Sequence, residues 1–85
     1  MGITQAFTYT NGSQDRLLLI LEPWGEEYWI YPGEQVDITV RNGVRGKPFD
    51  LEHTKEGLIV YGSQGSVISI LRDGKELPPN LQSKL

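Results

Sequence analysis

The feature that most constrains this chain is the return of turn-forming residues at short intervals along its length. Glycine, proline, asparagine and aspartate gather at these places, and each group suits a turn or a chain break. None of the intervening runs shows the period of an amphipathic helix. The sequence therefore predicts an all-β protein. The turn signals are Asn11-Gly12, Pro23-Trp24-Gly25, Pro32-Gly33, Asn42-Gly43, Gly62-Ser63-Gln64-Gly65, Asp73-Gly74 and Pro78-Pro79.

The runs between the turns have the composition of β-strands, because they are rich in valine, isoleucine, threonine and aromatic residues. The clearest is 35–41, in which apolar and polar residues alternate as they do in a strand with one face in a core. Asn11-Gly12 is a favoured hairpin dipeptide and predicts a hairpin after the first run. The predicted strands are Ala6–Thr10, Arg16–Glu22, Tyr28–Tyr31, Gln35–Arg41, Phe49–His53, Gly57–Tyr61, Val67–Arg72 and Lys75–Leu77.

About seven or eight short strands separated by frequent turns predict a small antiparallel β-sandwich, with a small closed β-barrel as the alternative. The layout resembles immunoglobulin-like or cupredoxin-like sandwiches. A chain of 85 residues makes a single domain, which we expect to span 1–77. Pro78-Pro79 ends the last run, so 78–85 is expected to form a loose C-terminal tail.

Three runs are apolar at consecutive positions, so both faces of each would be apolar. They are Leu17–Leu21, Leu58–Tyr61 and Val67–Leu71, the last interrupted only by Ser69. A two-sheet domain covers one face of each strand, so the second face must be hidden by loops or by another molecule. Because monomers rarely expose a continuous apolar patch, we expect a homodimer or a higher homo-oligomer.

The aromatic residues are concentrated in 21–38, which contains both tryptophans and two of the four tyrosines. If 28–31 is a strand, Trp29 and Tyr31 share one face, with Trp24 on the turn nearby. Three interpretations remain open: these rings belong to the core, they seal an interface between copies, or they form a surface that binds carbohydrate or peptide.

Metal and cofactor chemistry finds few ligands in this sequence. His53 is the only histidine and there is no cysteine, so a zinc site of the usual ligands cannot be built within one chain. A blue-copper centre needs two histidines and a cysteine, so a cupredoxin-like fold would lack the copper. We expect no metal and no cofactor.

Catalytic residue types are present but are not arranged in a recognisable pattern. Asp50, Glu52 and His53, with Ser63 or Ser66, could supply a hydrolytic triad. No nucleophile elbow or phosphate-binding loop accompanies them, and in a strand His53 points away from Asp50 and Glu52. We therefore expect the protein not to be an enzyme.

Charge is divided along the chain. The segment 17–40 carries five acidic residues and no basic one, whereas 41–48 carries Arg41, Arg45 and Lys47 and no acid. The basic segment could contact an anion or an acidic partner. The net charge of -3 and the lack of interleaved aromatics argue against a nucleic-acid partner.

Location and membrane association also follow from the sequence pattern. The longest apolar run, Leu17–Leu21, is too short to cross a bilayer, which takes about 20 residues, so no membrane partner is expected. The first residues lack the pattern of a signal peptide, and we expect a soluble cytoplasmic protein.

Together these observations predict a small non-enzymatic interaction or structural domain that self-associates through an apolar sheet face. The alternative is a carbohydrate- or peptide-binding module that uses Trp24, Trp29 and Tyr31.

Overall fold

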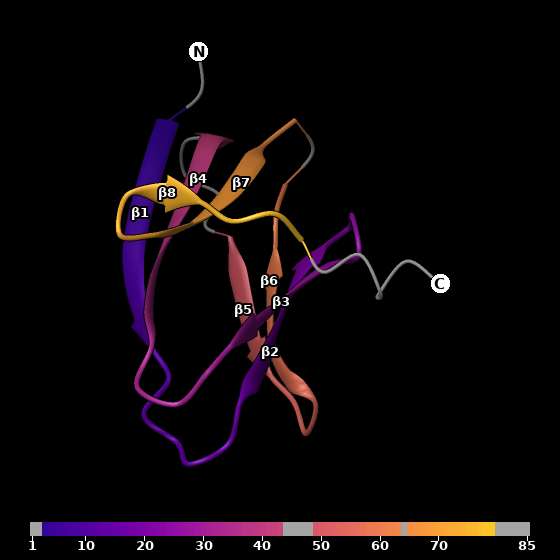
Figure 1. The fold of residues 1–85 in the computed structure, drawn as a ribbon. Helices are drawn as coiled ribbons and strands as arrows, with labels where there is room; N and C mark the ends of the chain where they lie inside the picture. Colours follow the sequence, from indigo (N-terminus) through magenta and orange to yellow (C-terminus); the bar gives the residue numbers. More distant parts are fainter. Residues whose placement is uncertain (1–2, 44–48, 64, 80–85) are drawn as a thin grey trace.

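The computed structural model describes residues 3–43, 49–63 and 65–79, and these form strands, turns and loops without a helix (Figure 1). The prediction of an all-β fold is confirmed. The strands are β1 (Ile3–Thr10), β2 (Leu17–Glu22), β3 (Glu26–Ile30), β4 (Gln35–Gly43), β5 (Asp50–His53), β6 (Gly57–Tyr61), β7 (Val67–Arg72) and β8 (Lys75–Glu76).

The strands form two separate four-stranded sheets in the orders β1-β4-β7-β8 and β3-β2-β6-β5 (Figure 1). Because the described strands pair only within these two open sheets, they form a β-sandwich and not a closed barrel. Five of the six pairings between described strands are antiparallel. The sixth, between β2 and β6, is parallel, so the predicted antiparallel sandwich is confirmed with one parallel pair.

The core lies between the sheets and takes alternate residues of their strands. The clean alternation predicted for β4 is confirmed, since Val36, Ile38 and Val40 are all buried. Each fully buried aliphatic side chain of this size contributes about 1.5–3 kcal/mol through removal of apolar surface from water. Among the described residues, the buried hydrophobic core consists of Leu19, Leu21, Tyr28, Ile30, Val36, Ile38, Val40, Leu58, Val60, Ile68 and Ile70.

Two of the predicted turns have the expected backbone. Glu34 N–H donates to the carbonyl of Tyr31 at 2.9 Å and Gly33 has φ +81°, as a type II turn at Pro32-Gly33 requires. At the β7–β8 hairpin, Asp73 and Gly74 both have positive φ, as in a type I′ turn.

The hairpin predicted at Asn11-Gly12 is not formed, because β1 pairs with β4 and the dipeptide leads into the other sheet. Asn11 is instead buried, and its Nδ2 donates to the carbonyls of Ile30 at 2.8 Å and Asp15 at 2.9 Å. The carboxamide thus ties the β1–β2 connection to the end of β3. These hydrogen bonds satisfy the buried carboxamide of Asn11, so they explain why asparagine is found here although no tight turn forms.

Candidate functional site

The outward side of the β3-β2-β6-β5 sheet carries an unusual number of apolar side chains. Leu19 and Leu21 point into the core, so their neighbours in β2 point outward, and the same alternation holds in β3 and β6. The outward residues are half-buried or exposed. We call this set the apolar outer face; it consists of Leu18, Ile20, Trp29, Ile59 and Tyr61.

The strand register joins these residues into one surface. Leu18 lies opposite Trp29 on β3, and Ile20 lies opposite Ile59 on β6. The parallel contact between β2 and β6 brings together two apolar runs that are far apart in the sequence. It depends on Gly57, since a Cβ at this position would overlap the carbonyl oxygen of Leu18. The third apolar run, Val67–Leu71, belongs to the other sheet, so the expected patch is built from two of the three runs.

Carboxylates border the apolar outer face on both sides. One row across the sheet runs from Glu27 on β3 through Ile20 and Ile59 to Glu52 on β5, so it has an acid at each end. A second row places Glu22 and Asp50 on the two sides of Tyr61. We call Glu22, Glu27, Asp50 and Glu52 the acidic rim.

Tyr61 connects the apolar outer face to the acidic rim. Its hydroxyl donates a hydrogen bond to Glu52 Oε1 at 2.7 Å. This bond is the main reason that the pKa of Tyr61 is raised above 10.0, and the charges of Glu52 and Glu22 act in the same direction. The phenol is neutral at physiological pH, as tyrosine ordinarily is, and its ring is available for a contact.

A cation lies at one corner of this surface. The guanidinium carbon of Arg16 is 3.9 Å from the ring centroid of Trp29, which is a cation–π contact. Arg16 immediately precedes β2 and is exposed. With four acidic residues and one arginine, the outer side of this sheet is strongly negative.

The predicted aromatic surface is divided by the fold. Trp29 and Tyr31 both line a shallow depression of about 210 Å³, together with Arg72. Trp24 lies beyond the other end of β3, is 42% exposed and lines a different cavity. The core interpretation of Trp29 and Tyr31 was wrong, because Tyr28 takes the inward position and Tyr31 is 48% exposed.

Of the three basic residues in the segment 41–48, the structure describes Arg41. Arg41 is exposed on the outer side of β4, and its Nη2 donates to Ser69 Oγ at 3.3 Å. Arg45 and Lys47 lie outside the described residues. The expected contact with an anion or an acidic partner stays a prediction.

The residues of the hypothetical triad are separated by β6. His53 lies opposite Leu58, near the start of this strand, whereas Ser63 and Ser66 follow its end. Ser66 Oγ donates to the carbonyl of Ser63 at 2.7 Å and not to an imidazole. Asp50 and Glu52 lie in the acidic rim, on the face of β5 opposite to His53. The fold does not assemble this triad.

The residues that the structure describes lack two further features. They contain no group of three or more histidine, cysteine or acidic side chains placed to hold a metal ion. They also contain no helix that could span a membrane.

Comparison with family models, with curated proteins and with solved structures finds no match to this chain.

Sequence reasoning found the apolar runs but missed how they combine. Because these runs are apolar at consecutive positions, alternation alone does not show that Leu18, Ile20 and Ile59 point outward. No residue pattern predicts the parallel pairing of β2 with β6, and this pairing makes the surface continuous. The acidic rim depends on the same pairing.

Proposed function

We propose that this protein is a small non-enzymatic interaction domain whose apolar outer face binds a protein segment with apolar side chains flanked by lysine or arginine. The observation that carries the proposal is the row Glu27–Ile20–Ile59–Glu52, in which an apolar centre has a carboxylate at each edge. Apolar contact supplies most of the affinity in such a surface, and charge at the border selects the partner.

Charge placement favours a foreign partner over a second copy. In a face-to-face pair of copies centred on this row, a two-fold axis along the strands sets Glu27 over Glu52 of the partner copy. An axis across the strands sets each glutamate over its own equivalent. Either arrangement brings like charges together, which is unfavourable. Self-association, expected from the apolar runs alone, stays a prediction and is an outcome of the same test.

The carbohydrate interpretation has less support. A sugar-binding surface of stacked rings needs aromatic residues on one platform. Here Trp24 is at one end of β3, whereas Trp29 and Tyr31 line a separate shallow depression. The Trp29 ring is also covered by the Arg16 guanidinium.

The proposal is tested with two synthetic amphipathic peptides, one of leucine and lysine and one of leucine and glutamate. Calorimetry should show binding of the lysine peptide and weakening of that binding by salt, because exposed charges are screened. The double variant Glu27→Gln, Glu52→Gln should bind the lysine peptide about tenfold more weakly.

Asp37→Asn is the matched control, because Asp37 is exposed on the outer side of the other sheet. It should bind the lysine peptide as the wild type does. Equal binding of both peptides, or equal loss in the control, would contradict the proposal. A wild-type protein that is a dimer by light scattering at neutral pH, with the apolar outer face covered by the second copy, would also contradict the proposal.

A further inference from the structure

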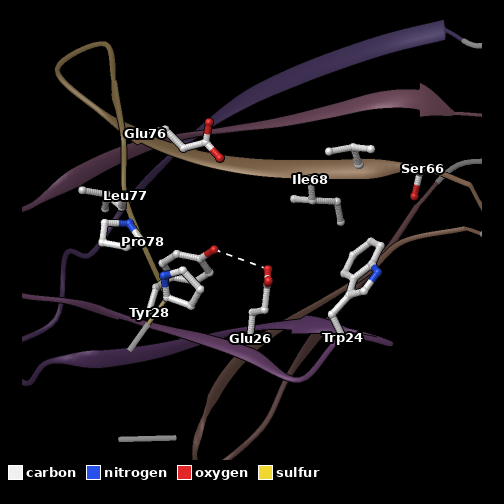
Figure 2. Close-up of a pocket in the computed structure, with 10 residues that line it drawn as sticks. Trp24, Glu26, Tyr28, Ser66, Ile68, Glu76, Leu77 and Pro78 are labelled. Carbon is white, nitrogen blue, oxygen red and sulfur yellow. Dashed lines mark hydrogen bonds between the residues drawn. The ribbon is translucent and has the colours of Figure 1, made fainter. Parts of the chain in front are cut away.

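A second candidate site lies at the edge of the sandwich where β3 faces β8. A cavity of about 550 Å³ opens there between the two sheets (Figure 2). Its lining includes Trp24, Glu26, Tyr28, Ile68, Glu76 and Pro78. The volume is in the range of pockets that hold small ligands or single side chains. We call it the edge pocket.

The polar groups of the edge pocket are mainly acidic. Glu26 lies between Trp24 and Tyr28, and Glu76 lies above them on β8 (Figure 2). Tyr28 hydroxyl is 3.5 Å from Glu26 Oε1, a long hydrogen bond that leaves the carboxylate with free acceptor capacity. Among the described residues the ion pair present is Arg72–Glu34 at 3.0 Å, so neither pocket carboxylate has a cationic partner there.

The ionisation of Tyr28 reports the potential inside the edge pocket. Its pKa is raised to about 12, first by burial and then by the charges of Glu26 and Glu76. Both carboxylates thus act on the same point within the cavity. The negative potential of the two carboxylates disfavours a further negative charge at this point, and for the same reason it favours a positive charge there.

The aromatic wall of the edge pocket has a fixed position. A Cβ built on Gly62 would lie 2.7 Å from Cη2 of Trp24, so the indole packs directly on the backbone at this glycine. The ring is nevertheless 42% exposed, and it stands across the cavity from Tyr28 (Figure 2). An indole and two carboxylates around one space are the groups that stack on and accept hydrogen bonds from a planar cation.

We propose that the edge pocket binds a guanidinium group, stacked on Trp24 and hydrogen-bonded to Glu26 and Glu76. A metal ion is a poorer occupant, because the described residues provide no cluster of three ligands and the walls are largely apolar. The proposal goes beyond the one made for the apolar outer face, since none of these three residues belongs to that face or to its rim.

The test uses N-acetyl-arginine amide as the probe and the citrulline analogue, which has the same shape without the charge, as its control. Trp29→Phe protein leaves Trp24 as the only tryptophan, so its fluorescence reports occupancy of the edge pocket. We expect saturable binding of the arginine probe and none of the citrulline analogue. Glu26→Gln and Glu76→Gln should each weaken binding about tenfold, because each removes one charge-assisted hydrogen bond.

Glu56→Gln is the matched control, because Glu56 is exposed in the turn between β5 and β6. It should leave binding unchanged. Unchanged melting temperatures of the three variants would show that lost binding is not lost folding. Equal binding of citrulline, equal weakening by Glu56→Gln, or no saturation at millimolar probe would each overturn the proposal.

The source of the guanidinium is resolved by two further probes, agmatine and an arginine peptide with glycine on either side. Both contain the proposed group, and binding of either supports the site. Equal affinities indicate a free small molecule, whereas a preference for the peptide indicates a protein side chain. Variants of the acidic rim should not change these affinities, so failure of this proposal and failure of the proposed function are distinguishable.

Discussion

The two outer sides of this sandwich differ in the kind of side chain that they present to solvent. On β1-β4-β7-β8 the outward side chains pair with one another, as in Thr8–Asp37 at 3.1 Å and Arg41–Ser69 at 3.3 Å. On β3-β2-β6-β5 the outward side chains are mostly apolar and only the border is charged. Both sheets bury a similar inner side, so the fold needs neither kind of outer side. The apolar one is therefore the better candidate for function.

The largest expected effect separates the two sides of a single strand. Leu19→Ala should lower the free energy of unfolding by about 3 kcal/mol, because the fully buried side chain leaves a cavity. Leu18→Ala, one residue away on the half-buried outer side, should lower it by about 1 kcal/mol or less. Urea denaturation of both variants measures the difference. Equal losses would mean that the outer side is structural and would remove the comparison.

The next effect makes the apolar outer face resemble the polar one. Ile59→Thr retains a β-branched residue in β6 and introduces a hydroxyl where Ile20 and its neighbours need apolar contact. We expect affinity for the leucine–lysine peptide to fall about tenfold, with the melting temperature nearly unchanged. Titration calorimetry and thermal denaturation give the two readings. Retained affinity would place the peptide elsewhere on the protein.

A smaller effect compares two tyrosines of the same sheet. The pKa of Tyr28, on the inner side, is raised to about 12 mainly by burial, whereas the pKa of Tyr61, on the outer side, is raised mainly by its hydrogen bond to Glu52. Glu52→Gln should therefore lower the pKa of Tyr61 and leave that of Tyr28 unchanged, as phenolate absorbance can measure. A shift in Tyr28 instead would contradict the separation of the two sides.

The sign of the Tyr28 effect on stability is also fixed. The folded protein holds the phenol proton more tightly than the unfolded chain, whose pKa is 10.0. The contribution is thus complete below pH 10.0 and is lost as the pH rises toward about 12. The denaturation midpoint of the wild type should fall across this pH range. It should fall less in the Glu26→Gln variant, because loss of the Glu26 charge lowers the pKa of Tyr28.

The smallest effect concerns the cation on Trp29. Arg16→Gln should change the free energy of unfolding by about 0.5 kcal/mol, because an exposed cation–π contact is weak. Its fluorescence consequence should be clearer, since Trp29 loses the group that covers it. Acrylamide quenching in a Trp24→Phe background measures this, and unchanged quenching would show that Arg16 does not cover the ring in solution.

The sequence was most informative where one residue pattern sets one structure. Alternation in β4 fixed its inner side, and Pro32-Gly33 and Asp73-Gly74 fixed their turns. It failed where the outcome depends on distant partners. Asn11-Gly12 is a favoured hairpin pair, but the buried hydrogen bonds of Asn11 to the end of β3 outweigh that preference.

The candidate sites show the same limit. The apolar runs in β2 and β6 are visible in the sequence, but their parallel contact follows from the topology. Glu26 and Glu76 are ordinary surface glutamates by sequence, and only the meeting of β3 with β8 sets both against one cavity. Local residue patterns were enough to predict the strands, whereas both candidate sites depend on contacts between segments that are far apart in the sequence.

The most direct test of the central claim is a methyl NMR titration with the leucine–lysine peptide. Isoleucines report both sides of the sandwich, since Ile20 and Ile59 lie on the apolar outer face while Ile38 and Ile70 are fully buried. We predict progressive shifts of the Ile20 and Ile59 methyl signals and little change at Ile38 and Ile70. Unchanged Ile20 and Ile59 signals at saturating peptide would contradict the account.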